Sequence, residues 1–528
     1  MIFTRFSFLV FILLSLWSCN QTQPVPSAAP ASTEPHRPAF HFSPPEKWMN
    51  DPNGMVYYEG EYHLFYQYYP DSTVWGPMHW GHAVSKDLVR WEHLPIALYP
   101  DSLGLIFSGS AVVDWNNTSG FGQNGQPPLV AIFTHHNMPA EKQSKLPWQY
   151  QSIAYSNDKG RTWTKYAGNP VMPNPHPSFR DFRDPKVVWD AGSKQWVMAL
   201  AVGDHTQFWG SPDLKNWIHL SDFGKTWGAH GGVWECPDLF PIAVEGTQEQ
   251  HWILLKSLNP GGPNGGSGTQ YFVGSFDGRQ FVPDPDFLPS IAPEGSGRAV
   301  WLDYGRDNYA GVTWSDVPAA DGRRLFIGWM SNWDYAQVVP TETWRSAMTL
   351  PRTLTLRKTP AGLRLFSEPV KELETLRGKK TTLASQTIDG ALELRGLSPR
   401  QLELMLEIEP TPGATFAIEL SNSKGEVYRI GYEAAKQQFF SDRTRSGKTA
   451  FSEAFAKSVH TAPRIADDGL VKLHLFFDRA SAELFADNGA TVMTEVFFPT
   501  KGYGKIRLVA SGGKVRLVKG EGFELAYR

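Results

Sequence analysis

The sequence repeats one pattern of turns and short strands five times between residues 40 and 352, and this repeat constrains the fold more than any other feature. Each unit contains a turn followed by two apolar strands, and the units begin at residues 51, 108, 184, 235 and 303. A hairpin whose second strand starts with an aromatic residue recurs at intervals of about 63 residues. Its aromatic residues are Trp91, Trp163, Trp217 and Phe281.

Five units of about four strands each, with no helical periodicity, predict a five-bladed β-propeller. A ring of repeated sheets leaves few strand edges exposed, which so many short strands would otherwise present to solvent. The composition agrees, because 13% aromatic residues together with 48 glycines and 40 prolines favour short strands and tight turns over helices. We therefore expect an all-β propeller domain over residues 39–352.

A second all-β domain is predicted after the propeller. Tryptophan is absent after Arg352, residues 367–380 are charged, and residues 353–380 are interpreted as a linker. Within residues 381–528, the segments 470–478, 481–487 and 491–499 alternate apolar and polar residues, as half-buried antiparallel strands do. The expected fold class is all-β, a five-bladed β-propeller followed by a C-terminal β-sandwich.

The beginning of the sequence indicates export. Residues 1–19 combine a basic start with an apolar run of about 12 residues, as in a signal peptide, whereas a membrane span takes about 20. Leu16-Trp17-Ser18-Cys19 resembles a bacterial lipobox, so we expect lipidation of Cys19 and anchoring in the bacterial envelope, on its periplasmic side or at the cell surface. Ordinary secretion is the alternative. Residues 20–38 are rich in Pro, Ser and Ala and are expected to form a flexible tether.

Charge and cysteine content exclude several classes of partner and cofactor. The 50 basic and 53 acidic residues are spread without runs, so no nucleic acid partner is expected, and contact with a membrane is expected only through a lipid at Cys19. Cys19 and Cys236 lie in contexts too different to predict a disulfide. His135 and His136 lack a third metal ligand, and the glycine-rich stretch 259–268 lacks the lysine and helix of a phosphate loop, so neither metal nor cofactor is expected.

Three carboxylates mark a candidate catalytic centre. The innermost strand of every propeller blade begins at the same end of the central channel, so equivalent residues of different blades converge. Asp51, Asp184 and Glu235 stand at the start of three units, in WMNDPNG, RDP and WECP. An Asp beside Pro is often only a turn residue, but three acids at equivalent places favour a shared funnel. Clustered carboxylates repel, so one of them should keep its proton near neutral pH, as cleavage of a glycosidic bond requires.

Six motifs also resemble those of a known family. WMNDPNG (48–54), FYQYYP (65–70), FSGSA (107–111), FRDP (182–185), WECPD (234–238) and GWMSNW (328–333) are similar to motifs of glycoside hydrolase family 32, which contains invertases, inulinases and levanases. The resemblance spans both domains and implies a propeller joined to a sandwich. It further implies a retaining hydrolase with Asp51 as nucleophile, Glu235 as general acid and then base, and Asp184 as a stabiliser that binds fructose hydroxyls.

The resemblance also implies a pocket for fructose, in which polar side chains bind hydroxyls and aromatic side chains form a wall. The residues carried over to this pocket are Asn50, Gln67, Trp75, Phe107 and Ser108.

Some further candidates for the site also have a structural interpretation. Arg183 is expected to keep Asp184 ionised, although a purely structural ion pair is the alternative. Trp48, Trp333 and Asp303 are candidate substrate-binding residues, and the two tryptophans could instead belong to the blade core.

The neighbour of the general acid, Cys236, lacks a positioned histidine. It is therefore expected to be a packed thiol and no nucleophile.

The expected function is release of terminal fructose from levan, inulin or sucrose by an exo-acting β-fructosidase, because residues 312–333 look more like levanases and exo-inulinases than like plant invertases. A transfructosylase of the same family and a non-catalytic glycan-binding lipoprotein are the alternatives. A retaining mechanism predicts that the carboxyl groups of Asp51 and Glu235 lie about 5–5.5 Å apart. The second domain is expected mainly to cover apolar propeller surface.

Overall fold

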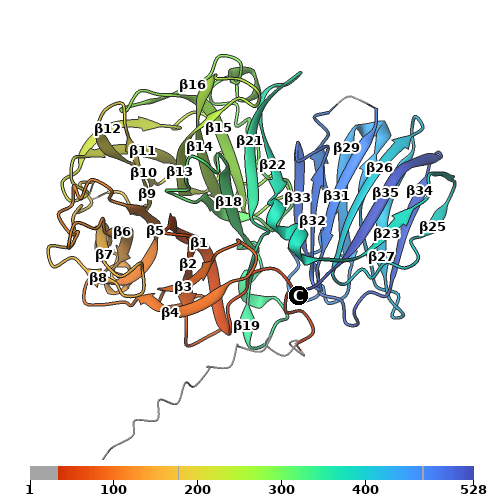
Figure 1. Cartoon of the computed structure of the whole chain (residues 1–528), viewed down its shortest axis with the longest axis horizontal. Helices are drawn as coiled ribbons and strands as arrows, with labels where there is room; N and C mark the ends of the chain where they lie inside the picture. The colour runs from red at the N-terminus through yellow and green to blue at the C-terminus, as the bar shows by residue number, and fades with distance from the viewer. Residues whose placement is uncertain (1–33, 177, 467–468, 528) are drawn as a thin grey trace, which may run out of the picture. The chain divides into compact units, whose positions relative to one another are not determined.

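Five sheets follow one another along the chain and form the blades of a propeller (Figure 1). The computed structural model describes residues 34–176, 178–466 and 469–527; the predicted signal peptide with Cys19 and most of the predicted tether lie outside these residues. Blade 1 comprises β1 (Lys47–Tyr58), β2 (Glu61–Tyr69), β3 (His79–Ser85) and β4 (Glu92–Leu98). Blade 2 comprises β5 (Leu105–Val113), β6 (Leu129–His136), β7 (Gln149–Ser156) and β8 (Thr164–Lys165).

Blades 3 and 4 repeat this antiparallel order. Blade 3 comprises β9 (Phe182–Asp190), β10 (Gln195–Val202), β11 (His205–Ser211) and β12 (Ile218–Phe223). Blade 4 comprises β13 (Val233–Ala243), β14 (Gln250–Asn259), β15 (Gly268–Phe276) and β16 (Phe281–Pro283). Short helices lie between strands at α1 (Met138–Lys142) and η1 (Leu288–Ser290).

The fifth blade extends further along the chain than the sequence predicted. It comprises β17 (Tyr309–Thr313), β18 (Arg324–Met330), β21 (Arg352–Thr359) and β22 (Gly362–Pro369). The interpretation of 353–380 as a linker is therefore wrong over β21 and β22, whose alternating apolar residues pair in register with β18 and with each other. Between β18 and β21 lie η2 (Ala336–Val338), β19 (Trp344–Arg345) and β20 (Ala347–Met348).

The first strands of the blades form a closed ring. They contact one another in the cycle β1, β5, β9, β13, β17 and back to β1. The second strand of a blade, such as β6, is buried along its whole length because each blade packs between two others, whereas the outer strand β12 is largely exposed. This cycle places the starts of the five inner strands around one channel mouth, which confirms the five-bladed propeller.

A seven-stranded sheet and a six-stranded sheet form the C-terminal β-sandwich, which confirms the prediction (Figure 1). The first sheet comprises β23 (Arg377–Leu383), β24 (Gln386–Ile388), β26 (Leu402–Pro410), β31 (Val471–Phe477), β32 (Ser481–Ala486), β33 (Thr491–Val496) and β35 (Val515–Leu525). The second comprises β25 (Ala391–Glu393), β27 (Thr415–Ser421), β28 (Val427–Glu433), β29 (Gln438–Arg445), β30 (His460–Pro463) and β34 (Lys505–Ser511). The helices η3 (Lys371–Leu376) and η4 (Ala434–Lys436) flank these strands, and β23 begins before the predicted domain start at residue 381. Inward-facing apolar residues of both sheets form one core between them.

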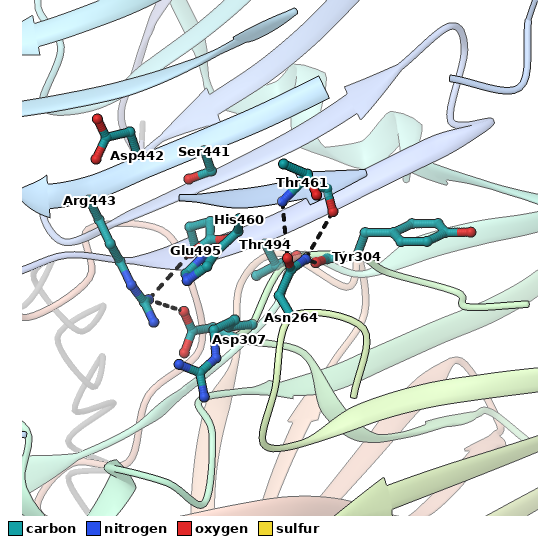
Figure 2. A network of polar contacts seen from close by, with 12 residues as sticks. Asn264, Tyr304, Asp307, Ser441, Asp442, Arg443, His460, Thr461, Thr494 and Glu495 are labelled. Carbon is teal, nitrogen blue, oxygen red and sulfur yellow. Dashed lines mark hydrogen bonds and ion pairs between the residues drawn. The ribbon is translucent and has the colours of Figure 1, made fainter. Parts of the chain in front are cut away.

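Buried ion pairs join the propeller to the sandwich. Arg443 of β29 contacts Asp307, which precedes β17, at 2.6 Å, and both side chains are fully buried (Figure 2). Arg352 of β21 pairs with Glu483 of β32 at 2.6 Å. Each of these charges is desolvated, so its partner is needed to offset the cost of burial.

The described end of the predicted tether is packed against the sandwich. His36 is buried, with its Nε2 3.0 Å from the backbone oxygen of Pro499. The tether predicted over 20–38 is therefore too long at its C-terminal end. Within the described ranges, no helix has the length and apolar character needed to cross a membrane.

Candidate active site

A β-bulge interrupts the first strand of every blade at the same level. In β1 the pairing shifts between Met49 and Pro52, so Asn50 and Asp51 together oppose one residue of β2. Shifts at equivalent places occur in β5, β9, β13 and β17. A bulge inserts an extra residue and redirects a side chain out of the ladder. At or directly beside these bulges, side chains of β1, β5, β9 and β13 are aimed at the same channel mouth.

These bulges carry the three predicted carboxylates into one cavity. Asp51 lies in the bulge of β1, Asp184 in that of β9, and Glu235 directly precedes that of β13. All three line a cavity of about 340 Å³, within the range of ligand sites. Asp184 and Cys236 adopt the left-handed backbone region, with φ of 61° and 42°. Such strain is typical of functional sites held in place by their surroundings.

Asp51 is held by two side-chain donors. Ser108 Oγ donates a hydrogen bond to Asp51 Oδ2 at 2.7 Å, and Asn50 Nδ2 donates to Oδ1 at 3.0 Å. Asn50 is fixed in turn by Trp48, whose indole N–H donates to its Oδ1 at 2.7 Å. Burial and the nearby charge of Glu235 raise the pKa of Asp51, while the two donors oppose this rise.

Asp184 is held by backbone and hydroxyl groups. The backbone N–H of Cys236 donates to Asp184 Oδ2 at 3.0 Å, and the backbone N–H of Asp184 donates to Thr134 Oγ1 at 3.1 Å. Burial raises the pKa of Asp184 to about 7, with Glu235 and Asp51 adding to the rise and Arg183 opposing it. The cluster therefore retains a proton near neutral pH, as repelling carboxylates should.

Glu235 is held by a cation and a phenol. Arg183 Nη2 donates to Glu235 Oε1 at 2.8 Å, and the hydroxyl of Tyr309 donates to Oε2. Arg183 Nη1 also donates to Asp181, whereas its Nε lies 3.9 Å from Asp184 Oδ2. Arg183 thus contacts Glu235 more closely than Asp184, the residue it was predicted to orient. Tyr309 was not predicted.

The thiol of Cys236 lies beneath two of the carboxylates. Its Sγ is 3.7 Å from Asp51 Oδ2 and 3.7 Å from Asp184 Oδ2. Burial and the three surrounding carboxylates raise the pKa of the thiol well above its usual range. Within the described residues no histidine is hydrogen-bonded to this sulfur, so the geometry fits the predicted packed thiol.

Most of the predicted pocket residues line the same cavity. Gln67 donates from Nε2 to the backbone oxygen of Ile106 at 3.0 Å, which fixes its amide. Trp75 and Phe107 meet edge to face with ring centroids 6.1 Å apart. The predicted residues in the lining are Asn50, Asp51, Gln67, Trp75, Phe107, Ser108, Arg183, Asp184, Glu235 and Trp333.

Two predicted substrate-binding residues do not lie in the cavity lining. Trp48 is fully buried in the core of blade 1 and stacks on Trp333 with centroids 5.9 Å apart, so it supports the wall without forming it. Asp303 is buried at the contact with the sandwich, where it pairs with Arg352 at 2.9 Å and accepts from Thr494 Oγ1 at 2.6 Å. The prediction that Asp303 binds substrate is corrected, because both carboxylate oxygens have other partners.

Six residues that line the active-site cavity were not predicted from the sequence. His136 and Gln149 lie opposite each other on β6 and β7, next to the bulge of β5, which the sequence does not show. Asn259 ends β14 and is the first residue of the glycine-rich stretch, which was the one signal in the sequence. The missed residues are His136, Glu141, Gln149, Asp181, Asn259 and Gln337.

Family models match both domains of the chain. The model of the glycosyl hydrolases family 32 N-terminal domain matches residues 41–369. The model named glycosyl hydrolases family 32 C terminal matches residues 372–522. The boundary between the two matches lies just after β22, where the structure ends the fifth blade.

Individual relatives are similar over nearly the whole chain. A levanase of Bacillus subtilis is 50% identical over 489 residues, which cover 92% of this chain and 69% of the relative. An extracellular exo-inulinase of Aspergillus niger is 41% identical over 511 residues, covering 92% of this chain and 94% of the relative.

Solved structures show the same architecture. The exo-inulinase of Aspergillus awamori matches with a TM-score of 0.86 and 39% identity, covering 94% of this chain and 99% of that chain. A β-fructofuranosidase of Schwanniomyces occidentalis complexed with fructosyl-erythritol matches with a TM-score of 0.79 and 33% identity, covering 94% of this chain and 98% of that chain.

Proposed function

Because the chain belongs to glycosyl hydrolase family 32, we propose that it is an exo-acting fructan β-fructosidase that releases terminal fructose from levan, inulin and sucrose. The observation that carries this proposal is the convergence of Asp51, Asp184 and Glu235 from equivalent bulges of three blades into one cavity. The levanase and exo-inulinase relatives support the choice of fructans as substrates.

Asp51 is the nucleophile of the proposed mechanism. Its carboxylate attacks the anomeric C2 of a β-fructosyl unit and forms a covalent fructosyl-enzyme through an oxocarbenium-like transition state. The hydrogen bonds from Ser108 and Asn50 fix the direction of attack, so that little reorganisation is needed on the way to the transition state.

Glu235 is the proposed general acid and then base. In the first step its carboxyl group protonates the departing oxygen, and in the second it takes a proton from the water that hydrolyses the fructosyl-enzyme. Arg183 and Tyr309 hold its two oxygens, which keeps the carboxyl group at one position through both steps. Two displacements at the same carbon retain the configuration of the sugar.

Asp184 is the proposed stabiliser of the fructosyl ring. Hydrogen bonds that the ring hydroxyls donate to its carboxylate strengthen as positive charge develops on the ring. Trp75, Phe107 and Trp333 supply aromatic surface around the ring, and Gln67 supplies amide groups for its hydroxyls. A cavity of about 340 Å³ is near the lower end of the range for ligand sites, which suits a chain end better than a segment passing through.

Product analysis tests this function. Levan, inulin and sucrose are digested side by side, and free fructose is expected as the first product of each. Early release of fructo-oligosaccharides from the polymers would contradict exo action. Oligosaccharides longer than the substrate would favour a transfructosylase, and no release from any of the three would overturn the proposal in favour of a glycan-binding protein.

We further propose that Cys19 carries a lipid that anchors the exported protein in the bacterial envelope. The support is the lipobox-like Leu16-Trp17-Ser18-Cys19 at the end of a short apolar run. Mass spectrometry of the mature N-terminus should find a lipid-modified Cys19, and Cys19→Ala should move the protein from the membrane fraction to the soluble fraction. A soluble mature protein without lipid would support ordinary secretion.

A further inference from the structure

A second cavity lies where the first strands of the propeller end. Its volume is about 340 Å³, and it shares no lining residue with the active site. Its walls come from the C-terminal parts of β5, β9 and β13 and from residues 313–316 at the end of β17. Because the bulges near the starts of these same strands line the active site, the second cavity belongs to the opposite mouth of the channel.

The two most exposed tryptophans of the described chain line this cavity. Trp115 is 60% exposed and Trp189 is 36% exposed. The indole N–H of Trp115 donates to Asp316 Oδ1 at 2.9 Å, and Trp189 meets Trp196 edge to face with centroids 5.2 Å apart. Both rings are thus held in place while offering open faces. Fixed aromatic faces bind apolar surfaces at little cost in side-chain entropy.

Unpaired hydroxyls stand beside these rings. Thr313 and Ser315 both line the cavity, and their side-chain oxygens are buried without a hydrogen-bond partner in the described structure. Thr313 is fully buried. A buried polar group without a partner is costly unless a ligand or water satisfies it. These two hydroxyls therefore point to a ligand that carries its own donors and acceptors.

The charges around the cavity are balanced. Lys186 Nζ lies 3.1 Å from Asp238 Oδ1 and donates to the backbone oxygen of Thr313 at 2.8 Å. Arg324 and Asp316 supply one further charge of each sign to the lining. No excess of either sign is left to attract an ion, so an uncharged ligand with apolar faces and many hydroxyls fits the lining best. A sugar has these properties.

We propose that this cavity is a second, non-catalytic binding site for a fructosyl segment of the polymer whose chain ends are cleaved at the other mouth. This step rests on the proposed function for the choice of fructan. Holding one part of a branched or aggregated polymer raises the local concentration of its chain ends near the active site. The site should therefore matter for long fructans and not for sucrose.

Native gels that contain levan, inulin or dextran test the proposal. The full chain carrying Asp51→Asn is used, so that the polymer is not consumed. Retardation in levan or inulin, and not in dextran, is expected. Trp115→Ala and Trp189→Ala should each weaken this retardation, with an apparent affinity for the polymer that is lower by about tenfold. Ile218→Ala, an exposed apolar residue on β12, is the matched control and should change nothing.

Kinetics of the otherwise unsubstituted protein separate this site from the active site. Trp115→Ala and Trp189→Ala should leave kcat/KM for sucrose unchanged and raise the KM for levan. Two results would overturn the proposal: retardation in levan and inulin that is unchanged in both tryptophan variants, or equal retardation in dextran. Failure of the proposed function would appear separately, as no fructose release by the unsubstituted protein from any substrate.

Discussion

The backbone N–H of Cys236 donates to Asp184 Oδ2 across 3.0 Å, so the bulge that follows Glu235 holds the carboxylate of the neighbouring blade. Both residues of this contact have positive φ, and neither is glycine. The strained backbone of blade 4 and that of blade 3 therefore support each other. This arrangement ties the carboxylate of Asp184 to the main chain directly after Glu235.

The thiol group of Cys236 should not be needed for catalysis. Its thiol keeps its proton because burial and the adjacent carboxylates raise its pKa, and the main-chain N–H, which a substitution keeps, donates to Asp184 over a shorter distance than the thiol does. Cys236→Ala is therefore expected to keep kcat/KM on sucrose within about tenfold of the parent, or about 1.4 kcal/mol. Iodoacetamide should not inactivate the parent. Inactivation that fructose prevents would contradict this prediction.

Asp51 should be indispensable. Asp51→Asn keeps the shape of the side chain but removes the nucleophilic oxygen charge, and turnover of sucrose should fall by about 10⁴-fold or more, as for other covalent nucleophiles. Fructose release measured under saturating sucrose checks this. Asp389→Asn, which alters an exposed carboxylate of the sandwich, is the control and should leave turnover unchanged. A loss of less than about tenfold in Asp51→Asn would assign the nucleophile elsewhere.

Arg183 should set the acidic limb of the pH profile. Burial raises the pKa of Asp184 to about 7, and the charge of Arg183 opposes this rise. Removing that charge in Arg183→Met raises the pKa of Asp184 further, so Asp184 takes up its proton at higher pH and the acidic limb of kcat/KM should move to higher pH by about 1–3 units. Arg183→Lys should move it less, and Arg161→Met, in an exposed ion pair with Glu61, should not move it. A limb that moves to lower pH would contradict the prediction.

The repeat in the sequence was sufficient to find the three acids, because the period of a propeller fixes where inner strands begin. It could not reveal the bulges, which depend on the pairing of β1 with β2 and of β13 with β14. For the same reason the fifth unit was misjudged. Its start was set at Asp303, whereas β17 begins at Tyr309, the residue that precedes the bulge in blade 5 as Glu235 does in blade 4.

The sequence pattern also did not show where the propeller ends along the chain. The composition changes after Arg352 and residues 367–380 are charged, which suggested a linker over 353–380. Alternating leucines such as Leu354 and Leu365 join the core of blades 4 and 5, and two of the charged residues, Arg352 and Arg364, are themselves buried. The pairing of strands in space decides which strand completes a blade. The sequence period does not show this pairing for blade 5, because a long insertion separates β18 from β21.

His41 should make the stability of the protein depend on pH. It is buried between Asp478 at 2.8 Å and Glu483 at 2.9 Å, and these carboxylates raise its pKa from 6.5 to about 9 against the opposing effect of burial. The folded state therefore binds this proton more tightly than the unfolded state. The resulting stabilisation is complete below pH 6.5 and is lost as the pH rises through about 9. Thermal unfolding should show a smaller fall in Tm over this range for His41→Gln than for the parent, and parallel curves would contradict the prediction.

The propeller should depend on the sandwich for its solubility. One apolar cluster contains Trp314 and Leu376 together with Phe476, Phe485 and Val492 of the sandwich. Removal of the sandwich would expose this apolar surface and leave Arg352 without Glu483. An interface within one chain buries about 600–1,500 Å², and an exposed apolar patch of that size promotes association.

A chain that ends after Leu376 keeps all strands of the fifth blade and tests this dependence. It should be recovered as aggregates, while the full chain carrying Phe485→Ala should stay soluble with a free energy of unfolding lower by about 3–5 kcal/mol. Sedimentation and denaturant unfolding measure these two effects. A soluble, monomeric propeller with unchanged turnover of sucrose and of long fructans would show that the sandwich does not serve as a cover. Unchanged turnover of sucrose with weaker action on long fructans would instead assign the sandwich a part in binding polymer, because the active-site cavity itself is lined only by propeller residues.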